Sequence, residues 1–150
     1  GGHIGNELYK LGTQLDFNMI IVDDRLEYAN KEKYPLAETV CKDFEKVNID
    51  TKNAYVVIVT KSHKTDYIVL KSLIEKEYKY LGLIGSKKKV MSLLEELKEN
   101  HIDSTTYPNL YAPIGLSIAK NNPAEIAVSI MAEILLVKNS GQLTHMKLGN

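Results

Sequence analysis

The stretch "AYVVIVTKSHKTDYIVLKSLIEKEYKYLGLIG" (Ala54–Gly85) decides the fold that we predict for this sequence. It begins and ends with nearly unbroken apolar runs (54–60 and 80–85), as expected of strands that are covered on both faces. Between these runs, residues 66–76 repeat apolar side chains at the spacing of an amphipathic helix. Two buried strands joined by a crossover helix form a parallel βαβ unit, so we predict an α/β fold.

The same alternation of strands and helices continues on both sides of this unit. Residues 4–15 have helical spacing and lead into a third apolar run, "NMIIVDD" (Asn18–Asp24), and a last helix begins after an Asn122 N-cap. Only residues 26–52 depart from the alternation, with one short strand predicted at "ETVC" (38–41). We therefore predict a Rossmann-like, doubly wound, mostly parallel sheet with helices on both faces.

Length and composition favour one domain without a strong overall charge. The chain has 150 residues, of which we assign 1–141 to a Rossmann-like nucleotide- or cofactor-binding domain and 142–150 to a flexible tail. Its 19 basic and 19 acidic residues give a net charge of zero, so no global field attracts nucleic acid or an anionic membrane. No apolar run approaches the ~20 residues that span a bilayer.

The single cysteine and the first residue carry two further expectations. Cys41 alone excludes an intrachain disulfide, which indicates a reducing compartment, and we expect the cytoplasm. The sequence begins with Gly1, which belongs to an apparent turn, rather than with Met. We therefore interpret the chain as a fragment of a longer polypeptide.

The opening "GGHIG" is the first candidate binding motif. Gly2 and Gly5 fit the second and third glycines of the G-x-G-x-x-G turn that follows the first strand of a dinucleotide-binding fold, so that first strand would be missing here. Asp23 ends the next predicted strand about 20 residues later, where an acid meets the ribose hydroxyl. The alternative is a tight βα turn that binds no ligand.

The second candidate motif is "GSKKK" (85–89), which opens a helix. Gly85 allows the turn and Ser86 is suited to cap the helix, whereas the three lysines (87–89) lie where the helix dipole disfavours cations. A bound phosphate would remove that penalty, so the reversed charge suggests an anion site. The alternative is a solvated row of lysines.

Two more positions are candidates for chemistry. In "TKSHKTD" (60–66), His63 is suited to act as acid, base or hydrogen-bond donor, and Thr65 or Asp66 is expected to cap the next helix. No second Cys or His lies at ligand spacing, so we predict no metal site. Glu133 lies among apolar neighbours and needs either a partner or a ligand, unless it belongs to a narrow solvated stripe.

These stretches together resemble the C-terminal Rossmann domain of the xanthine dehydrogenase accessory proteins, the XdhC/CoxI family. The resemblance covers almost the whole chain in order and rests on six motifs: "GGHIG", "IIVDDR", "TKSHKTD", "YLGLIGSKKK", "APIGLSI" and "NNPAEIAVSIMAEI". The family also has a separate N-terminal region, to which nothing in this sequence corresponds.

The resemblance implies a maturation factor for a xanthine dehydrogenase-type molybdenum hydroxylase rather than an enzyme. Such a factor binds the molybdenum cofactor (molybdopterin, plain or in a nucleotide form), protects it during sulfuration by a cysteine desulfurase, delivers it to the apo-enzyme and acts as a homodimer. Carried over from the family, the cofactor-binding residues would be Gly2, His3, Gly5, Asp23, Arg25, Thr60, His63, Asp66, Gly85, Ser86, Lys87 and Lys89.

Two other classes of function remain open from the residues alone. One is a small NAD(P)-dependent oxidoreductase, with Asp23 on the adenine ribose and His63 as proton donor. The other is a nucleotide-sensing regulatory module, in which dinucleotide binding changes association with a partner.

Overall fold

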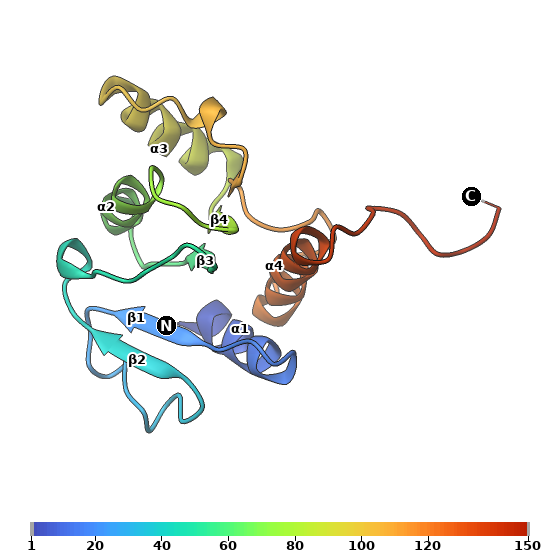
Figure 1. Cartoon of the computed structure of the whole chain (residues 1–150), viewed down its shortest axis with the longest axis horizontal. Coiled ribbons are helices and arrows are strands. Elements are labelled where there is room, and N and C mark those ends of the chain that lie inside the picture. The colour runs from blue at the N-terminus through green and yellow to red at the C-terminus, as the bar shows by residue number, and fades with distance from the viewer. Residues whose placement is uncertain (1, 150) are drawn as a thin grey trace.

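A computed structural model describes residues 2–149, and within them strands and helices alternate as an α/β fold (Figure 1). The helices are α1 (His3–Gln14), α2 (His63–Leu73), α3 (Lys87–Glu99) and α4 (Pro123–Lys138). The strands are β1 (Ile20–Asp23), β2 (Glu38–Cys41), β3 (Tyr55–Ile58), β4 (Tyr80–Leu83) and β5 (Leu110–Tyr111). Two single 3-10 turns, η1 (Phe44–Lys46) and η2 (Ser104–Thr106), complete the elements. The predicted fold class is confirmed.

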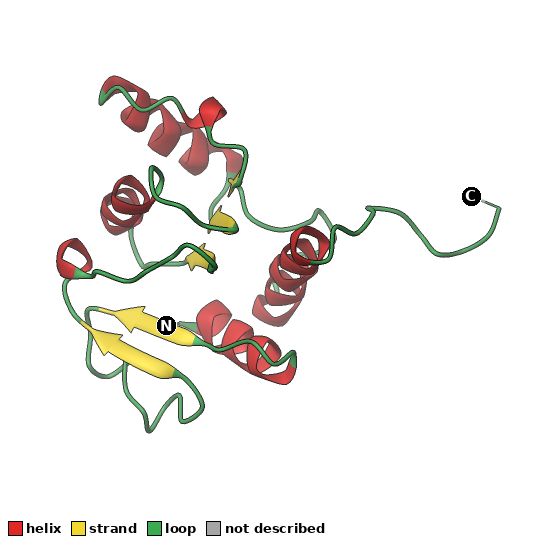
Figure 2. Ribbon diagram, viewed as in Figure 1, coloured by secondary structure: helices red, strands yellow, loops and turns green. Residues whose placement is uncertain are grey.

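The strands form two parallel sheets rather than the one sheet that we predicted. In the first sheet, β1 pairs with β2 in parallel, with Ile20 opposite Glu38. In the second, β4 lies between β3 and β5, and both pairings are parallel (Figure 2). The short β5 was not predicted, because two residues are too few for a periodic pattern.

Helices cover the strands on both faces, as expected of a doubly wound fold. One apolar cluster joins β4 to α2 and α3 through buried side chains such as Leu70, Leu81 and Leu93. A second cluster joins α1 to α4, with Leu8 and Ile130 packed around Tyr80. All four residues of β4 are buried, so this strand is the centre of the core.

Three local predictions need correction or comment. Helix α2 begins at His63, three residues before the predicted start, because the Ser62 side chain accepts a hydrogen bond from the Thr65 amide and caps the helix. The prediction that Thr65 or Asp66 is the cap is therefore wrong. The Asn122 N-cap is confirmed, since its side chain accepts from the amides of residues 124 and 125. The expected turn at Gly1 lies outside the described residues.

After α4, residues 142–149 are exposed and form no helix or strand, and they run away from the rest of the chain (Figure 1). Among residues 2–149, no helix has both the length and the apolar composition needed to cross a bilayer.

Candidate functional site

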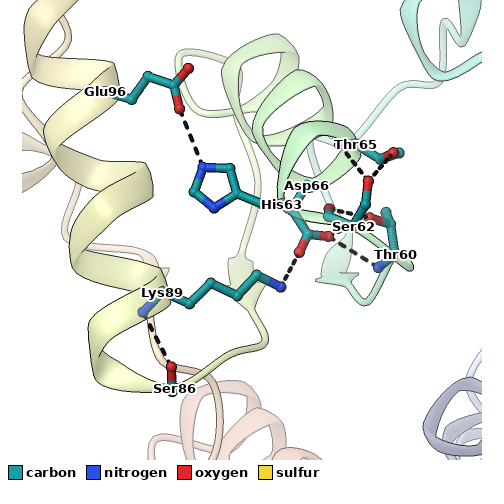
Figure 3. A network of polar contacts seen from close by, with 8 residues as sticks. All are labelled: Thr60, Ser62, His63, Thr65, Asp66, Ser86, Lys89 and Glu96. Atoms are coloured by element: carbon teal, nitrogen blue, oxygen red, sulfur yellow. Dashed lines mark hydrogen bonds and ion pairs between the residues drawn. The ribbon is translucent and has the colours of Figure 1, made fainter.

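Buried Asp66 is the centre of a polar network at the carboxyl end of β3 (Figure 3). Its Oδ1 atom accepts hydrogen bonds from the Thr60 hydroxyl at 2.6 Å and the Thr60 amide at 3.1 Å. Its Oδ2 atom accepts from the Lys89 ammonium at 2.6 Å. A buried carboxylate is tolerated when it is paired and hydrogen-bonded, as Asp66 is here. Because Asp66 belongs to α2 and its partners belong to the turn after β3 and to α3, the network connects these three segments.

The pairing with Asp66 gives one of the three lysines at the start of α3 a partner within the protein. The Lys89 side chain is 30% exposed, whereas Lys87 and Lys88 are exposed residues. Ser86 caps the helix as predicted, since its hydroxyl accepts from the Lys89 amide at 3.2 Å. Of the three lysines at the start of α3, Lys89 thus forms an ion pair with Asp66 inside the protein, and Lys87 and Lys88 remain exposed to solvent.

Gly85 shapes the turn that leads into α3. Its φ of +147° lies in a region that side chains avoid, and a Cβ atom there would approach Lys89 Cδ to 3.0 Å. The glycine therefore allows both the turn and the course of the Lys89 side chain toward its carboxylate.

His63 is the first residue of α2, and its side chain points toward α3 (Figure 3), with its Nε2 atom 3.4 Å from the Glu96 carboxylate. The two side chains are 45% and 43% exposed, and ion pairs so accessible to water contribute little stability. This placement gives the imidazole a carboxylate neighbour at the surface.

Asp23 ends β1 and is held by Arg25. The carboxylate is almost fully buried, and it accepts from the Arg25 amide at 3.0 Å and from the guanidinium at 2.9 and 3.1 Å. Burial raises the pKa of Asp23, the hydrogen bonds from Arg25 are among the interactions that lower it, and the net result is a pKa well below its ordinary value. A ribose hydroxyl would have to compete with this guanidinium for the carboxylate, which weakens the dinucleotide interpretation of Asp23.

The start of α1 offers main-chain donors. Gly2 is its N-cap in an extended conformation, without a side-chain hydrogen bond and without an acidic residue in the first turn. The first amides of a helix have no intrahelical acceptor and favour anions. A Cβ atom added at Gly2 or Gly5 would have nothing within 4 Å, so open space lies beside this turn.

A cavity of about 570 Å³ lies between β1 and β3. Of the predicted binding residues, Gly5, Asp23, Arg25 and Thr60 line it. The cavity lining does not include Gly2, His3, His63, Asp66, Gly85, Ser86, Lys87 or Lys89. The predicted set is thus divided between this cavity, the exposed start of α1, and the first turns of α2 and α3 with the Gly85 turn before α3.

Glu133 has its partner within the protein. One of its oxygens accepts from the Tyr80 hydroxyl at 2.7 Å and from the Gly115 amide at 2.9 Å, and the residue is buried. Burial and the bond to Glu133 both raise the pKa of Tyr80 above its ordinary value. The alternative of a solvated stripe is wrong for Glu133, and no local sequence signal indicated Tyr80, 53 positions away, as its partner.

No group of three or more His, Cys, Asp or Glu side chains in residues 2–149 is arranged to hold a metal ion.

Parallel strands, helices on both faces and helix starts at the strand ends define a domain of the dinucleotide-binding, Rossmann class. A family model described as the XdhC Rossmann domain matches residues 1–134, and the chain belongs to this family.

The chain spans only about a quarter to two fifths of the length of three longer proteins that it resembles. It is 33% identical over 145 residues to YqeB of Escherichia coli (strain K12), covering 93% of this chain and 26% of that protein. It is 28% identical over 132 residues to a probable xanthine dehydrogenase subunit of Bacillus subtilis (strain 168), covering 85% of this chain and 38% of that one. The crystal structure of a xanthine dehydrogenase from Bacillus halodurans superimposes with a TM-score of 0.78 at 30% identity, over 95% of this chain and 41% of that one.

Proposed function

We propose that the chain is the Rossmann part of an accessory factor that binds the molybdenum cofactor and delivers it to a xanthine dehydrogenase-type hydroxylase. The observation that carries this proposal is the match of the XdhC Rossmann domain to residues 1–134. The relatives named as xanthine dehydrogenase proteins support the link to that hydroxylase. The proposal includes a cytoplasmic location, a homodimer and contact with a cysteine desulfurase.

The residues fit the anionic part of such a cofactor. A pterin that carries a phosphate or a nucleotide diphosphate needs hydrogen-bond donors and cations around its oxygens. The first turn of α1 supplies main-chain amides beside the open space at Gly2 and Gly5. The exposed Lys87 and Lys88 supply positive charge at the start of α3. Lys89 is already bonded to Asp66, so this pair stabilises the start of α3 against the turn after β3 and leaves cofactor binding to the other two lysines.

Binding of a dinucleotide as redox cofactor has weaker support. The acid expected to hold the ribose, Asp23, already accepts hydrogen bonds from Arg25 on both of its oxygens. NAD and NADH are therefore included as ligands in the calorimetric titration described next.

The direct test is a calorimetric titration of the protein with molybdopterin, and in parallel with CTP, ATP, NAD and NADH. We expect molybdopterin to bind and the double variant Lys87→Ala/Lys88→Ala to weaken it by about tenfold, since each charge contributes roughly 0.3 to 1 kcal/mol near a helix N-terminus. The matched control is Lys71→Ala/Lys98→Ala, which removes two exposed lysines from the later turns of α2 and α3. Absence of molybdopterin binding in the parent chain would refute the proposal, as would equal losses in the two double variants.

A further inference from the structure

A second cavity, of about 390 Å³, lies at the amino ends of three neighbouring strands. Residues 52–53, 76–79 and 107–109 line it, and they belong to the segments that precede β3, β4 and β5. These strands are parallel, so the three segments meet at one edge of the sheet, opposite the edge that carries the Asp66 network. Open α/β sheets bind their usual ligands at the carboxyl ends of the strands. The usual site of the fold therefore does not account for this cavity.

Hydrogen bonds between the three segments fix the walls of the cavity. The Thr51 hydroxyl is buried and donates to the Glu77 carbonyl at 2.7 Å, which joins the segment before β3 to the segment before β4. The Asn109 side-chain amide donates to the Tyr78 carbonyl at 3.3 Å, which joins the segment before β4 to the segment before β5. Tyr78 is itself buried, and its hydroxyl donates to the Ile74 carbonyl at 2.8 Å. A cavity held in shape by its own walls loses little freedom when a ligand binds.

The lining of this cavity is positively charged. It contains Lys52, Lys76 and Lys79 against one acidic residue, Glu77, so its net charge is +2 in a chain whose net charge is zero. All three lysines are exposed, and none of their ammonium groups has an ion-pair or hydrogen-bond partner within residues 2–149. Like charges around one cavity repel each other, and a bound anion would remove that repulsion.

Local structure explains only one of the three lysines. Lys76 follows the C-terminal end of α2, where the helix dipole favours a cation. Lys52 and Lys79 precede strands, so no helix end favours a cation at either position. An anionic ligand accounts for all three positions with one cause.

We propose that this cavity binds a phosphorylated small molecule of the nucleotide class, with its phosphates among the three lysines. A lysine ammonium is a point charge with three donors, and it is a common partner of phosphate oxygens. A volume of about 390 Å³ also falls within the range of roughly 300 to 1,000 Å³ that small-molecule sites occupy.

The rest of the lining suits the uncharged part of such a ligand. Tyr107 lines the cavity, is half-buried and has no aromatic partner within residues 2–149. Its ring offers a surface on which a base stacks, and Pro108 extends the same wall. Asn53 adds a side-chain amide that both donates and accepts hydrogen bonds, as the edge of a base requires.

The test is a calorimetric titration with inorganic tripolyphosphate and with ATP, accompanied by amide NMR spectra. We expect both probes to bind, ATP more tightly, with shifts concentrated at the amides of residues 51–54, 76–79, 107 and 109. The variant Lys52→Ala/Lys76→Ala/Lys79→Ala should weaken both probes by about tenfold, since each partly exposed ion pair contributes a factor of roughly 1.5 to 5. Tyr107→Leu should weaken ATP by about fivefold or more and leave tripolyphosphate unchanged, because only ATP has a base to stack.

The matched control is Lys42→Ala/Lys71→Ala/Lys98→Ala, which removes the same charge from exposed positions outside the cavity. It should leave the affinity for both probes within about twofold of that of the parent chain, because exposed charges beyond the Debye length are largely screened. Absence of binding by both probes would overturn the proposal, as would equal losses in the two triple variants.

Two further outcomes would assign the charge to another ligand or another site. Binding of a hexaglutamate peptide, but of neither phosphate probe, would replace the nucleotide by an acidic peptide and overturn the proposal. Loss of probe binding in Lys87→Ala/Lys88→Ala, with no loss in the cavity variant, would place the anion at the start of α3 and also overturn it. Neither result depends on whether molybdopterin binds, because the two proposals use different lysines at opposite edges of the sheet.

Discussion

Removing the ammonium group of Lys89 tests the network around Asp66 most directly. The variant Lys89→Met keeps most of the apolar stem of the side chain and deletes only the charge that lies 2.6 Å from the carboxylate. Asp66 is fully buried, so its charge is left with the Thr60 hydroxyl and amide as its remaining donors.

The size of the loss follows from the burial of the pair. Breaking a fully buried ion pair by removing one partner costs roughly 3 to 5 kcal/mol. Lys89 is 30% exposed, so water reaches the vacated position and lowers the cost to about 2 to 3 kcal/mol. For a chain of this length, that corresponds to a fall in Tm of roughly 4 to 12 °C.

The assay is urea unfolding followed by circular dichroism, with Lys88→Met as the matched control at the neighbouring exposed position. A double-mutant cycle with Asp66→Asn should give a coupling free energy of at least about 1 kcal/mol, because the two groups are in direct contact. If Lys89→Met is no more destabilising than Lys88→Met, or if the cycle shows no coupling, the network does not hold the two helices together.

Two further predictions concern the turns at the strand ends. Asp23 has a lower pKa in the folded protein than in the unfolded chain, where the pKa is about 3.9. The ionised carboxylate therefore stabilises the fold above about pH 3.9, and this contribution is lost as the pH falls toward the folded-state pKa. The variant Arg25→Gln should therefore be less stable at pH 7, and the difference from the parent should shrink as the pH falls from about 5 to 2; a constant difference in thermal melts would contradict this. Gly85→Ala should lower the free energy of unfolding by roughly 1 to 2 kcal/mol because of its positive φ, whereas Gly2→Ala, at an extended and open position, should change it by less than about 0.5 kcal/mol. Equal effects of the two alanine substitutions in urea unfolding would show that backbone strain is not what Gly85 relieves.

The strand and helix positions could be predicted because they depend on local periodicity. The unbroken apolar runs at 54–60 and 80–85 contain β3 and β4, and the cap at Ser86 was recognised from its position before the helix. The predicted start of α2 was wrong because Ser62, Thr65 and Asp66 are all residue types that cap helices. The sequence does not show that Asp66 is instead buried and bonded to Thr60 and Lys89.

The partners of the charged residues could not be predicted in the same way. Lys89 and Asp66 are 23 positions apart, and Tyr80 and Glu133 are 53 positions apart. No periodicity connects residues on different elements, so the lysines of α3 appeared to be three equivalent cations. Only the packing of α2 against α3 distinguishes the one that neutralises a buried carboxylate.

The sequence by itself determined that this chain alternates strands and helices and belongs to the XdhC Rossmann family, because both conclusions depend on residues in a linear order. The tertiary structure decided which polar groups are already bonded to one another and which remain available. It also decided that β1 and β3 stand apart with an apolar cavity between their edges. The physical reason is that hydrogen bonding, ion pairing and burial depend on distances through space, which the chain fixes only when its elements pack together.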